Sequence, residues 1–216
     1  NMDTTVSCST FTDTWATNDG GSIYLYEYND GLSIDYCTFT HTWAADNGGS
    51  IYLYENNDCL FVSNCTFIAT SAANDGGSIF LNQQNDNMTI SDCSFTSTWA
   101  MIDGGSILLR SYNNLPSISN CYFTTTSAAI DGGSINLYQY NERLSVSNCT
   151  FDDTRAVNNG GSIYINHHNI DTTVSGSIFT HTWAAGNGGS IYLYEYNERL
   201  SVFYSVFTNT TAGDNG

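Results

Sequence analysis

The chain has 216 residues and a formal net charge of −17, because 21 aspartates and glutamates face only four arginines and no lysine. This charge excludes nucleic acid and anionic membrane surfaces as partners, since a polyanion is bound by clustered lysine and arginine. The sequence has no run of about 20 apolar residues, so we expect no membrane insertion.

One unit of 28 residues recurs along the whole chain without an insertion. Gly-Gly pairs recur with this period from Gly20 to Gly189, and phenylalanine recurs from Phe11 to Phe207. A strict repeat of this kind indicates a solenoid, in which each side chain stacks about 4.8 Å from its counterpart in the next coil. We expect a single β-solenoid that is a piece of a longer solenoid or of a filament. Its predicted coils are residues 1–28, 29–56, 57–84, 85–112, 113–140, 141–168 and 169–196, with a partial coil at 197–216.

The second coil shows, in chain order, the elements expected in every coil. Residues 32–34 predict a short strand with both leucine and isoleucine inward, and the alternation then changes near Tyr36, which predicts a bend before the inward residues of 37–39. Residues 42–44 predict another strand, a Gly-Gly turn follows, and residues 50–54 alternate as a half-buried strand. The fold class is therefore all-β: a parallel β-helix with about three short strands per coil.

The stretch Phe39–Ile51, which reads F-T-H-T-W-A-A-D-N-G-G-S-I, resembles the repeats of the chlamydial polymorphic membrane proteins. Those repeats pair an F-x-x-N motif with a G-G-A-I motif, and every complete coil here carries F-x-x-T and G-G-S-I instead. The resemblance implies a right-handed β-helix that is displayed outside the cell, often as an adhesin. The constant repeat length departs from that family and favours a more purely structural role.

These features predict an extracellular structural solenoid that forms a fibre, filament or adhesin stalk through coil stacking and an outward aromatic face. The expected partners are copies of the chain, end to end or side by side, and surface glycans or a host surface. An ice- or glycan-binding solenoid is the alternative, because outward threonines such as Thr38 and Thr40 would form rows. A carbohydrate-active enzyme is the third reading, based only on Asp152 and Asp153 near Arg155, and we expect no catalysis.

Two sets of columns are the main candidates for functional surfaces. An outward aromatic face is expected from two tyrosine columns, with members Tyr24, Tyr26, Tyr52, Tyr54, Tyr164, Tyr192 and Tyr194. A structural ladder of stacked amides is expected from one invariant column, with members Asn29, Asn57, Asn85, Asn113, Asn141, Asn169 and Asn197.

Three further patterns concern metals, thiols and glycosylation. Stacked acids at Asp30, Asp58 and Asp86 are weak candidates for a bound Ca²⁺, and no other cofactor is expected. Five cysteines share the column of Cys37, where a thiol ladder, vertical disulfides and a metal site all stay open. Glycosylation sequons favour an extracellular location and place acceptors at Asn64, Asn87, Asn148 and Asn209.

Overall fold

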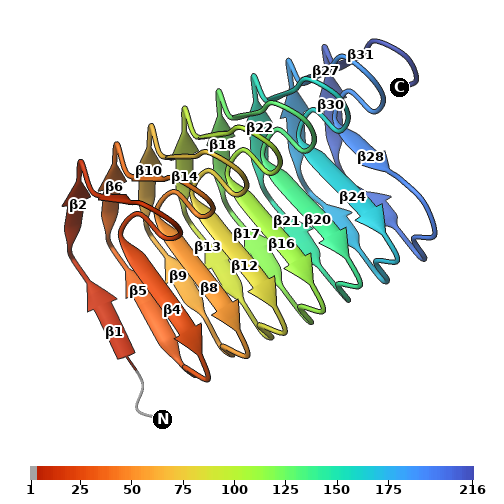
Figure 1. Cartoon of the computed structure of the whole chain (residues 1–216). Coiled ribbons are helices and arrows are strands. Elements are labelled where there is room, and N and C mark those ends of the chain that lie inside the picture. Colours follow the sequence, from red (N-terminus) through yellow and green to blue (C-terminus); the bar gives the residue numbers. More distant parts are fainter. Residues whose placement is uncertain (1–3) are drawn as a thin grey trace.

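The computed structural model describes residues 4–216, which form a stack of coils along one axis with the two ends of the chain at opposite ends of the stack (Figure 1). The first three residues of the predicted first coil lie outside the described residues. Each complete coil contributes one strand to each of four parallel sheets, here named A to D in chain order. None of the described residues is in a helix, and so none forms a helix that could cross a membrane.

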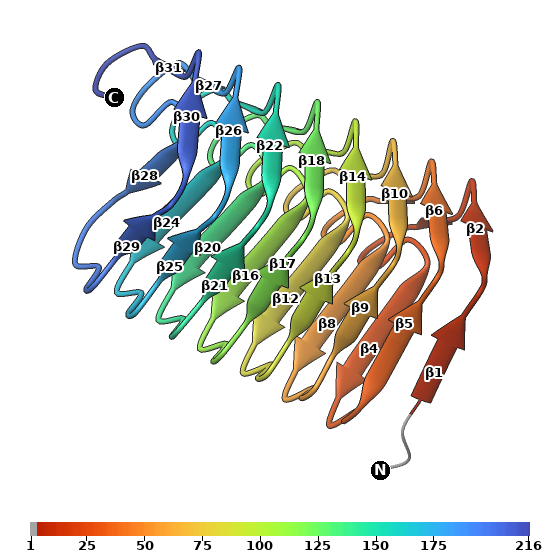
Figure 2. The same ribbon diagram turned by 180° about the vertical axis from the view of Figure 1, so that it is seen from behind.

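The strands of the four sheets alternate regularly along the chain (Figure 2). Sheet A contains β1 (Thr4–Ser7), β5 (Leu32–Asp35), β9 (Phe61–Ser63), β13 (Thr89–Ser91), β17 (Ser117–Ser119), β21 (Ser145–Ser147), β25 (Thr173–Ser175) and β29 (Ser201–Phe203). Sheet B contains β2 (Thr10–Thr12), β6 (Thr38–Thr40), β10 (Thr66–Ile68), β14 (Ser94–Thr96), β18 (Tyr122–Thr124), β22 (Thr150–Asp152), β26 (Ile178–Thr180) and β30 (Val206–Thr208). Sheet C contains β3 (Trp15–Ala16), β7 (Trp43–Ala44), β11 (Ser71–Ala72), β15 (Trp99–Ala100), β19 (Ser127–Ala128), β23 (Arg155–Ala156), β27 (Trp183–Ala184) and β31 (Thr211–Ala212). Sheet D contains β4 (Ile23–Glu27), β8 (Ile51–Glu55), β12 (Ile79–Gln83), β16 (Ile107–Ser111), β20 (Ile135–Gln139), β24 (Ile163–His167) and β28 (Ile191–Leu193).

The all-β parallel solenoid predicted from the repeat is confirmed, but each complete coil has four strands where the sequence analysis expected about three. The additional strand is the short sheet B segment, for example β6, which the change of alternation at Tyr36 separates from β5. The bend was recognised in the sequence. Its consequence, a separate sheet on each side of the bend, was not.

The core follows from the constant register of 28 residues. Phe67 pairs with Phe39 on one side and with Phe95 on the other, and all three are fully buried. Successive phenylalanine rings from Phe11 to Phe207 lie 4.7–4.8 Å apart and within 5° of parallel. Aliphatic columns from sheets A and D complete this core. Each core position therefore packs mainly against the same residue type in the next coil, which explains why the phenylalanine column is uniform.

The corners between sheets use left-handed backbone at fixed positions. In the second coil, Tyr36, His41 and Asn56 have φ near +52°, although left-handed backbone is unfavourable for most side chains. Their N–H groups donate to carbonyls of the next coil, as His41 does to Ile68 at 2.9 Å. The inter-coil hydrogen bonds thus continue around the corners and offset the backbone strain.

The Gly-Gly corner leaves no room for a side chain. A Cβ on Gly49 would lie 2.2 Å from the carbonyl oxygen of Gly77, while Gly48 has a φ of +61°. Gly49 is needed because the loop between sheets C and D passes this close to the next coil, and Gly48 because a Cβ there would lie 2.4 Å from the carbonyl oxygen of Ile51.

Candidate functional surfaces

The asparagine column forms a hydrogen-bonded ladder at the corner between sheets D and A. The N–H of Asn57 donates to Oδ1 of Asn85, and the N–H of Asn85 donates to Oδ1 of Asn113, each at 2.9 Å. The three side chains are buried. The bonds recur from Asn29 to Asn197. Because each amide is engaged by neighbouring coils, this column binds coil to coil.

The acidic column next to this ladder also bonds to the backbone. Oδ1 of Asp58 accepts the N–H of Asp86 at 3.0 Å, and Oδ1 of Asp86 accepts the N–H of Asn114 at 2.8 Å. Asp30 is exposed at the first turn of the same column. Within residues 4–216 no three His, Cys, Asp or Glu side chains are grouped as a metal site. Weak Ca²⁺ binding at these acids stays a prediction. One carboxylate oxygen of Asp58 and one of Asp86 already accept a backbone N–H.

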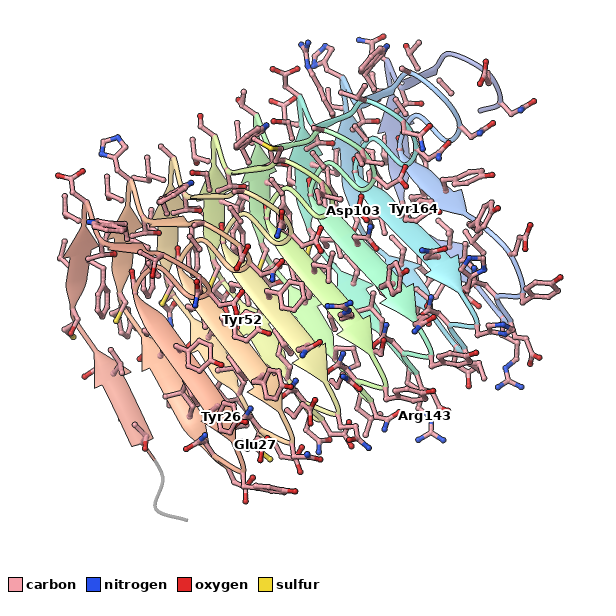
Figure 3. All side chains as sticks on the ribbon, viewed as in Figure 1. Tyr26, Glu27, Tyr52, Asp103, Arg143 and Tyr164 are labelled. Atoms are coloured by element: carbon pink, nitrogen blue, oxygen red, sulfur yellow. The ribbon has the colours of Figure 1, made fainter. Side chains whose placement is uncertain are left out.

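The two tyrosine columns differ in exposure. Tyr52 on β8 and Tyr164 on β24 are only 4% and 5% exposed, and both lie on sheet D (Figure 3). The loop between sheets C and D folds back over this column, so that a Cβ on Gly48 would lie 3.2 Å from the Cβ of Tyr52. Burial accordingly raises the pKa of Tyr52. Tyr52 forms a second small core with Phe80 and Leu108, although the sequence analysis placed Tyr52 on the outward aromatic face.

The other tyrosines of the expected aromatic face remain accessible. Tyr24, Tyr26 and Tyr194 are exposed, whereas Tyr54 and Tyr192 are half-buried. Tyr26 and Tyr54 are stacked with their ring centroids 5.1 Å apart and 1° between the planes. Stacking covers the facing sides of these two rings. The surface therefore offers both hydroxyl groups and ring surface to a partner.

A further aromatic stack was missed in the sequence. Tyr112, Tyr140, His168 and Tyr196 occupy one corner column, with ring centroids 4.9–5.1 Å apart and planes within 9°. All four have left-handed backbone. The signal was present in the residues, because the column recurs with the same period, but asparagine and glutamine at Asn56 and Gln84 hide its aromatic character.

The cysteine column of sheets A and B is a row of buried free thiols. Cys65 donates its Sγ–H to the carbonyl of Ser63 at 3.0 Å, and Cys93 does the same to Ser91 at 3.1 Å. Every cysteine of the chain lies among the described residues and is free, with Cys8 exposed and Cys59 half-buried away from the column. The structure therefore favours the thiol ladder over disulfides.

The four sequon asparagines share one environment. Asn64, Asn87, Asn148 and Asn209 are all exposed, and all have left-handed backbone at corners between sheets. An exposed corner is open to a modifying enzyme. Glycosylation itself stays a prediction.

The acidic cluster considered for catalysis lies on the surface beside sheet C. Arg155 donates to Oδ1 of Asp153 from Nε at 3.0 Å and from Nη2 at 2.7 Å. Nδ1 of His181, a residue from the next coil, lies 3.3 Å from Oδ1 of Asp152. A shallow hollow of about 300 Å³ lies here, with Trp183 in its wall. The two carboxylates thus contact different side chains, and the hollow is too open to exclude water from a reacting group.

Comparison with protein families identifies the family to which this architecture belongs. A family model described as right-handed beta helix region matches residues 21–214, which is most of the chain. The chain belongs to the right-handed β-helix family. No curated protein and no solved structure gives a significant match to this β-helix. The chlamydial class suggested by the F-x-x-T and G-G-S-I motifs is not what the match identifies, and it remains a resemblance.

One side of the β-helix carries a column of partly buried acids that the sequence analysis missed. The N–H of Asp103 donates to Oδ1 of Asp75 at 3.1 Å, and the N–H of Asp131 donates to Oδ1 of Asp103 at 2.9 Å. Burial raises the pKa of Asp103 to about 7, and the carboxylates of Asp75 and Asp131 add to this shift. Burial also raises the pKa of Asp75 to about 6. Asparagine takes the same place at Asn47 and Asn159, which concealed the acids in a mixed Asp/Asn column.

A second missed feature of the β-helix is an exposed apolar strip along sheet C, here called the tryptophan strip. It consists of the outward residue of each sheet C strand and the residue two positions later. Its large exposed members are Trp15, Trp43, Met101, Trp99, Val157 and Trp183. Exposed apolar residues that follow one another along a surface usually mark an interaction site.

Proposed function

We propose that this chain is an extracellular structural β-helix that builds a fibre, filament or adhesin stalk. The observation that carries the proposal is the unbroken register, because the same columns pair from the first coil to the last with no inserted loop. In repeat proteins, ligand sites are often built on insertions that project from one face. A rod of constant cross-section supplies length and stiffness instead.

The end faces of the described stack support growth along its axis. One end has an apolar hollow of about 450 Å³, with Ile191, Leu193 and Phe207 in its wall. The other end has a hollow of about 300 Å³ with Val6 and Ile23 in its wall. These residues belong to the same columns that pack between coils in the middle of the stack. A further coil, from the same polypeptide or from a second copy, would therefore meet matching columns.

The surface composition supports a location outside the cell. The sequons lie at exposed corners, and the net charge of −17 favours solubility of the chain. Contact with a host surface or with glycans would use the exposed tyrosines Tyr24, Tyr26 and Tyr194. We infer no enzymatic activity and no resident cofactor.

Electron microscopy of the purified chain over a range of concentrations tests this proposal. We expect rods whose length grows with concentration while their width stays constant. Coating of inert beads with the chain and measurement of their attachment to cells tests the adhesin role. Discrete particles of one length at every concentration, without attachment, would contradict the proposal.

An ice- or glycan-binding role is the second candidate, because sheet B carries outward threonines in register. Thr10 pairs with Thr38, and Thr12 pairs with Thr40. The rows are interrupted by Ile68, Tyr122 and Ile178, which weakens a lattice match. An ice-growth assay would separate this candidate from the structural role, and a reducing-end assay on polysaccharides would detect a carbohydrate-active enzyme.

A further inference from the structure

The tryptophan strip alternates large and small side chains. In sheet C, Ser71 pairs with Trp43 on one side and with Trp99 on the other, and Ser127 lies between Trp99 and Arg155. Each serine leaves a gap beside an indole. In the first three coils of sheet D, by contrast, the rings of Tyr24, Tyr52 and Phe80 stack directly on one another. The strip is therefore a row of knobs and holes rather than a continuous ladder.

We propose that the tryptophan strip is the interface between two copies of this chain, packed side by side with their axes antiparallel. A twofold axis parallel to the strands reverses the order of the coils and leaves the direction across the strip unchanged. When the third coil of one copy faces the fourth coil of the other, Trp99 lies opposite Ser71 of the second copy. By symmetry, Ser71 lies opposite Trp99 of the second copy.

The same register matches the remaining coils. The second coil faces the fifth, which brings Trp43 opposite Ser127 of the second copy. The first coil faces the sixth, which brings Trp15 opposite Arg155, a pairing of an indole with a guanidinium. Asp13 of the first coil then lies on the same side as Arg155 and Asp153 of the second copy, so the guanidinium has an acid from each chain. Every tryptophan of the paired coils meets a serine or the arginine.

The neighbouring column of the strip agrees with this register. Met101 faces Ala73 of the second copy, and Val157 faces Thr17. A shift by one coil destroys the match, because it sets Trp43 opposite Trp99 in one direction and Trp99 opposite itself in the other. A parallel arrangement is no better, since it sets each tryptophan against its own counterpart and each serine against a serine. Of the antiparallel registers that pair all of the first six coils, this one alone sets no tryptophan against a tryptophan.

Size and charge define the kind of complex expected. Six coils span about 29 Å along the axis, so the strip covers on the order of 600 Å² on each copy, the lower end for a specific interface. Each copy carries a charge of −17, which opposes pairing at low ionic strength. The proposal therefore describes a reversible dimer that salt strengthens. It deepens the side-by-side contact within the proposed function and rests on that function for its biological role.

Sedimentation equilibrium of the full chain at low and moderate salt tests the interface. At concentrations below those at which axial rods form, we expect a monomer–dimer equilibrium that shifts toward the dimer as salt screens the charge. Trp99→Ser removes a central indole at two symmetric places and should raise the dissociation constant by about thirtyfold or more, the effect of losing a central aromatic anchor. Trp183→Ser is the matched control, because Trp183 is 39% exposed against 37% for Trp99 but lies in the seventh coil, outside the six paired coils. Its dissociation constant should be that of the unaltered chain.

A swap of large for small residues tests the register itself. Ser71→Trp alone sets two indoles against each other and should weaken the dimer, whereas the double variant Ser71→Trp with Trp99→Ser exchanges knob and hole and should restore it. A chain that stays monomeric under all these conditions, or a Trp183→Ser variant as weak as Trp99→Ser, would overturn the proposal. A double variant whose dimer dissociates as readily as the dimers of the two single variants would also overturn it. Electron microscopy of Trp99→Ser keeps the two proposals apart, since axial rods should still form when only the lateral contact is lost.

Discussion

Oγ1 of Thr98 lies 2.6 Å from Oγ of Ser106, and both side chains are fully buried. The same pair recurs at 2.6 Å in each complete coil, from Thr14 with Ser22 to Thr182 with Ser190. The bond joins the residue just before the sheet C strand to the residue just before the sheet D strand, and so spans that strand and the loop after it. Each hydroxyl satisfies the other inside a corner that water does not reach, which explains why neither column varies within the chain.

The first prediction concerns this pair. Thr98→Val keeps the side-chain shape and leaves the Ser106 hydroxyl buried without its partner, so the free energy of unfolding should fall by about 1–3 kcal/mol. The double variant Thr98→Val with Ser106→Ala should lose less than the sum of the two single variants. Urea unfolding measures all three. Thr96→Val, at a half-buried position that faces outward on β14, is the control and should change stability by less than about 0.5 kcal/mol. Strict additivity would contradict the coupling.

The second prediction concerns the phenylalanine column. Phe67→Ala opens a cavity between the rings of Phe39 and Phe95 and should lower the free energy of unfolding by about 3–5 kcal/mol. Ile68→Ala removes the neighbouring outward side chain and should change it far less. Thermal and chemical unfolding are the measurements. A loss below about 1 kcal/mol for Phe67→Ala would show that the column does not face the core.

The third prediction concerns pH. The pKa of Asp103 rises from 3.8 to about 7 on folding, chiefly through burial, so the folded chain holds this proton more tightly than the unfolded chain. The stabilisation that this tighter proton binding provides is fully present below about pH 4. As the pH rises from there to about 7, the free energy of unfolding falls by at most about 1.4 kcal/mol per pH unit. Asp103→Asn uses a residue that the column already accepts at Asn47 and Asn159.

We therefore expect Asp103→Asn to be more stable than the unaltered chain at pH 8 and nearly equal to it at pH 4. Thermal unfolding at both values tests this, with the exposed acid variant Asp92→Asn as control. Equal effects of Asp103→Asn at the two pH values would contradict the assignment.

The fourth prediction concerns Asn136, which replaces the aromatic or aliphatic residue found at Phe80 and Leu108. Its side chain is fully buried, and neither amide atom has a hydrogen-bond partner. Asn136→Leu should therefore raise the free energy of unfolding by about 1–3 kcal/mol, since an unpaired amide is costly inside a protein. Asn141→Leu is the contrasting variant and should be destabilising, because Asn141 belongs to the satisfied amide ladder. Destabilisation by Asn136→Leu would show that its amide has a role beyond packing.

The sequence was sufficient for the architecture because a strict period converts directly into register. Phe39, Ile51 and Ala44 could be placed in the core from the columns alone, and the structure confirms each of them. Side-chain direction relative to a strand was also predictable, since Trp43 points outward and Ile34 inward. These are properties of single strands and of their neighbours one period away.

The covering of the outer surface could not be predicted in the same way. Tyr52 points away from the main core, but the loop before sheet D folds over it, and nothing in the alternation of β8 reveals the path of that loop. The raised pKa of Asp103 depends on the same loop. The tryptophan strip was missed because serine interrupts its column, so a row of exposed indoles resembled ordinary variation.

X-ray diffraction from aligned fibres of the native material tests the central claim most directly. Coils that stack along the fibre place all inter-strand hydrogen bonds parallel to its axis, with the spacing of 4.7–4.8 Å seen between the phenylalanine rings. We predict a sharp reflection at about this spacing along the fibre axis. Fibres in which this reflection lies across the axis, or native material that contains only short separate particles, would contradict the account.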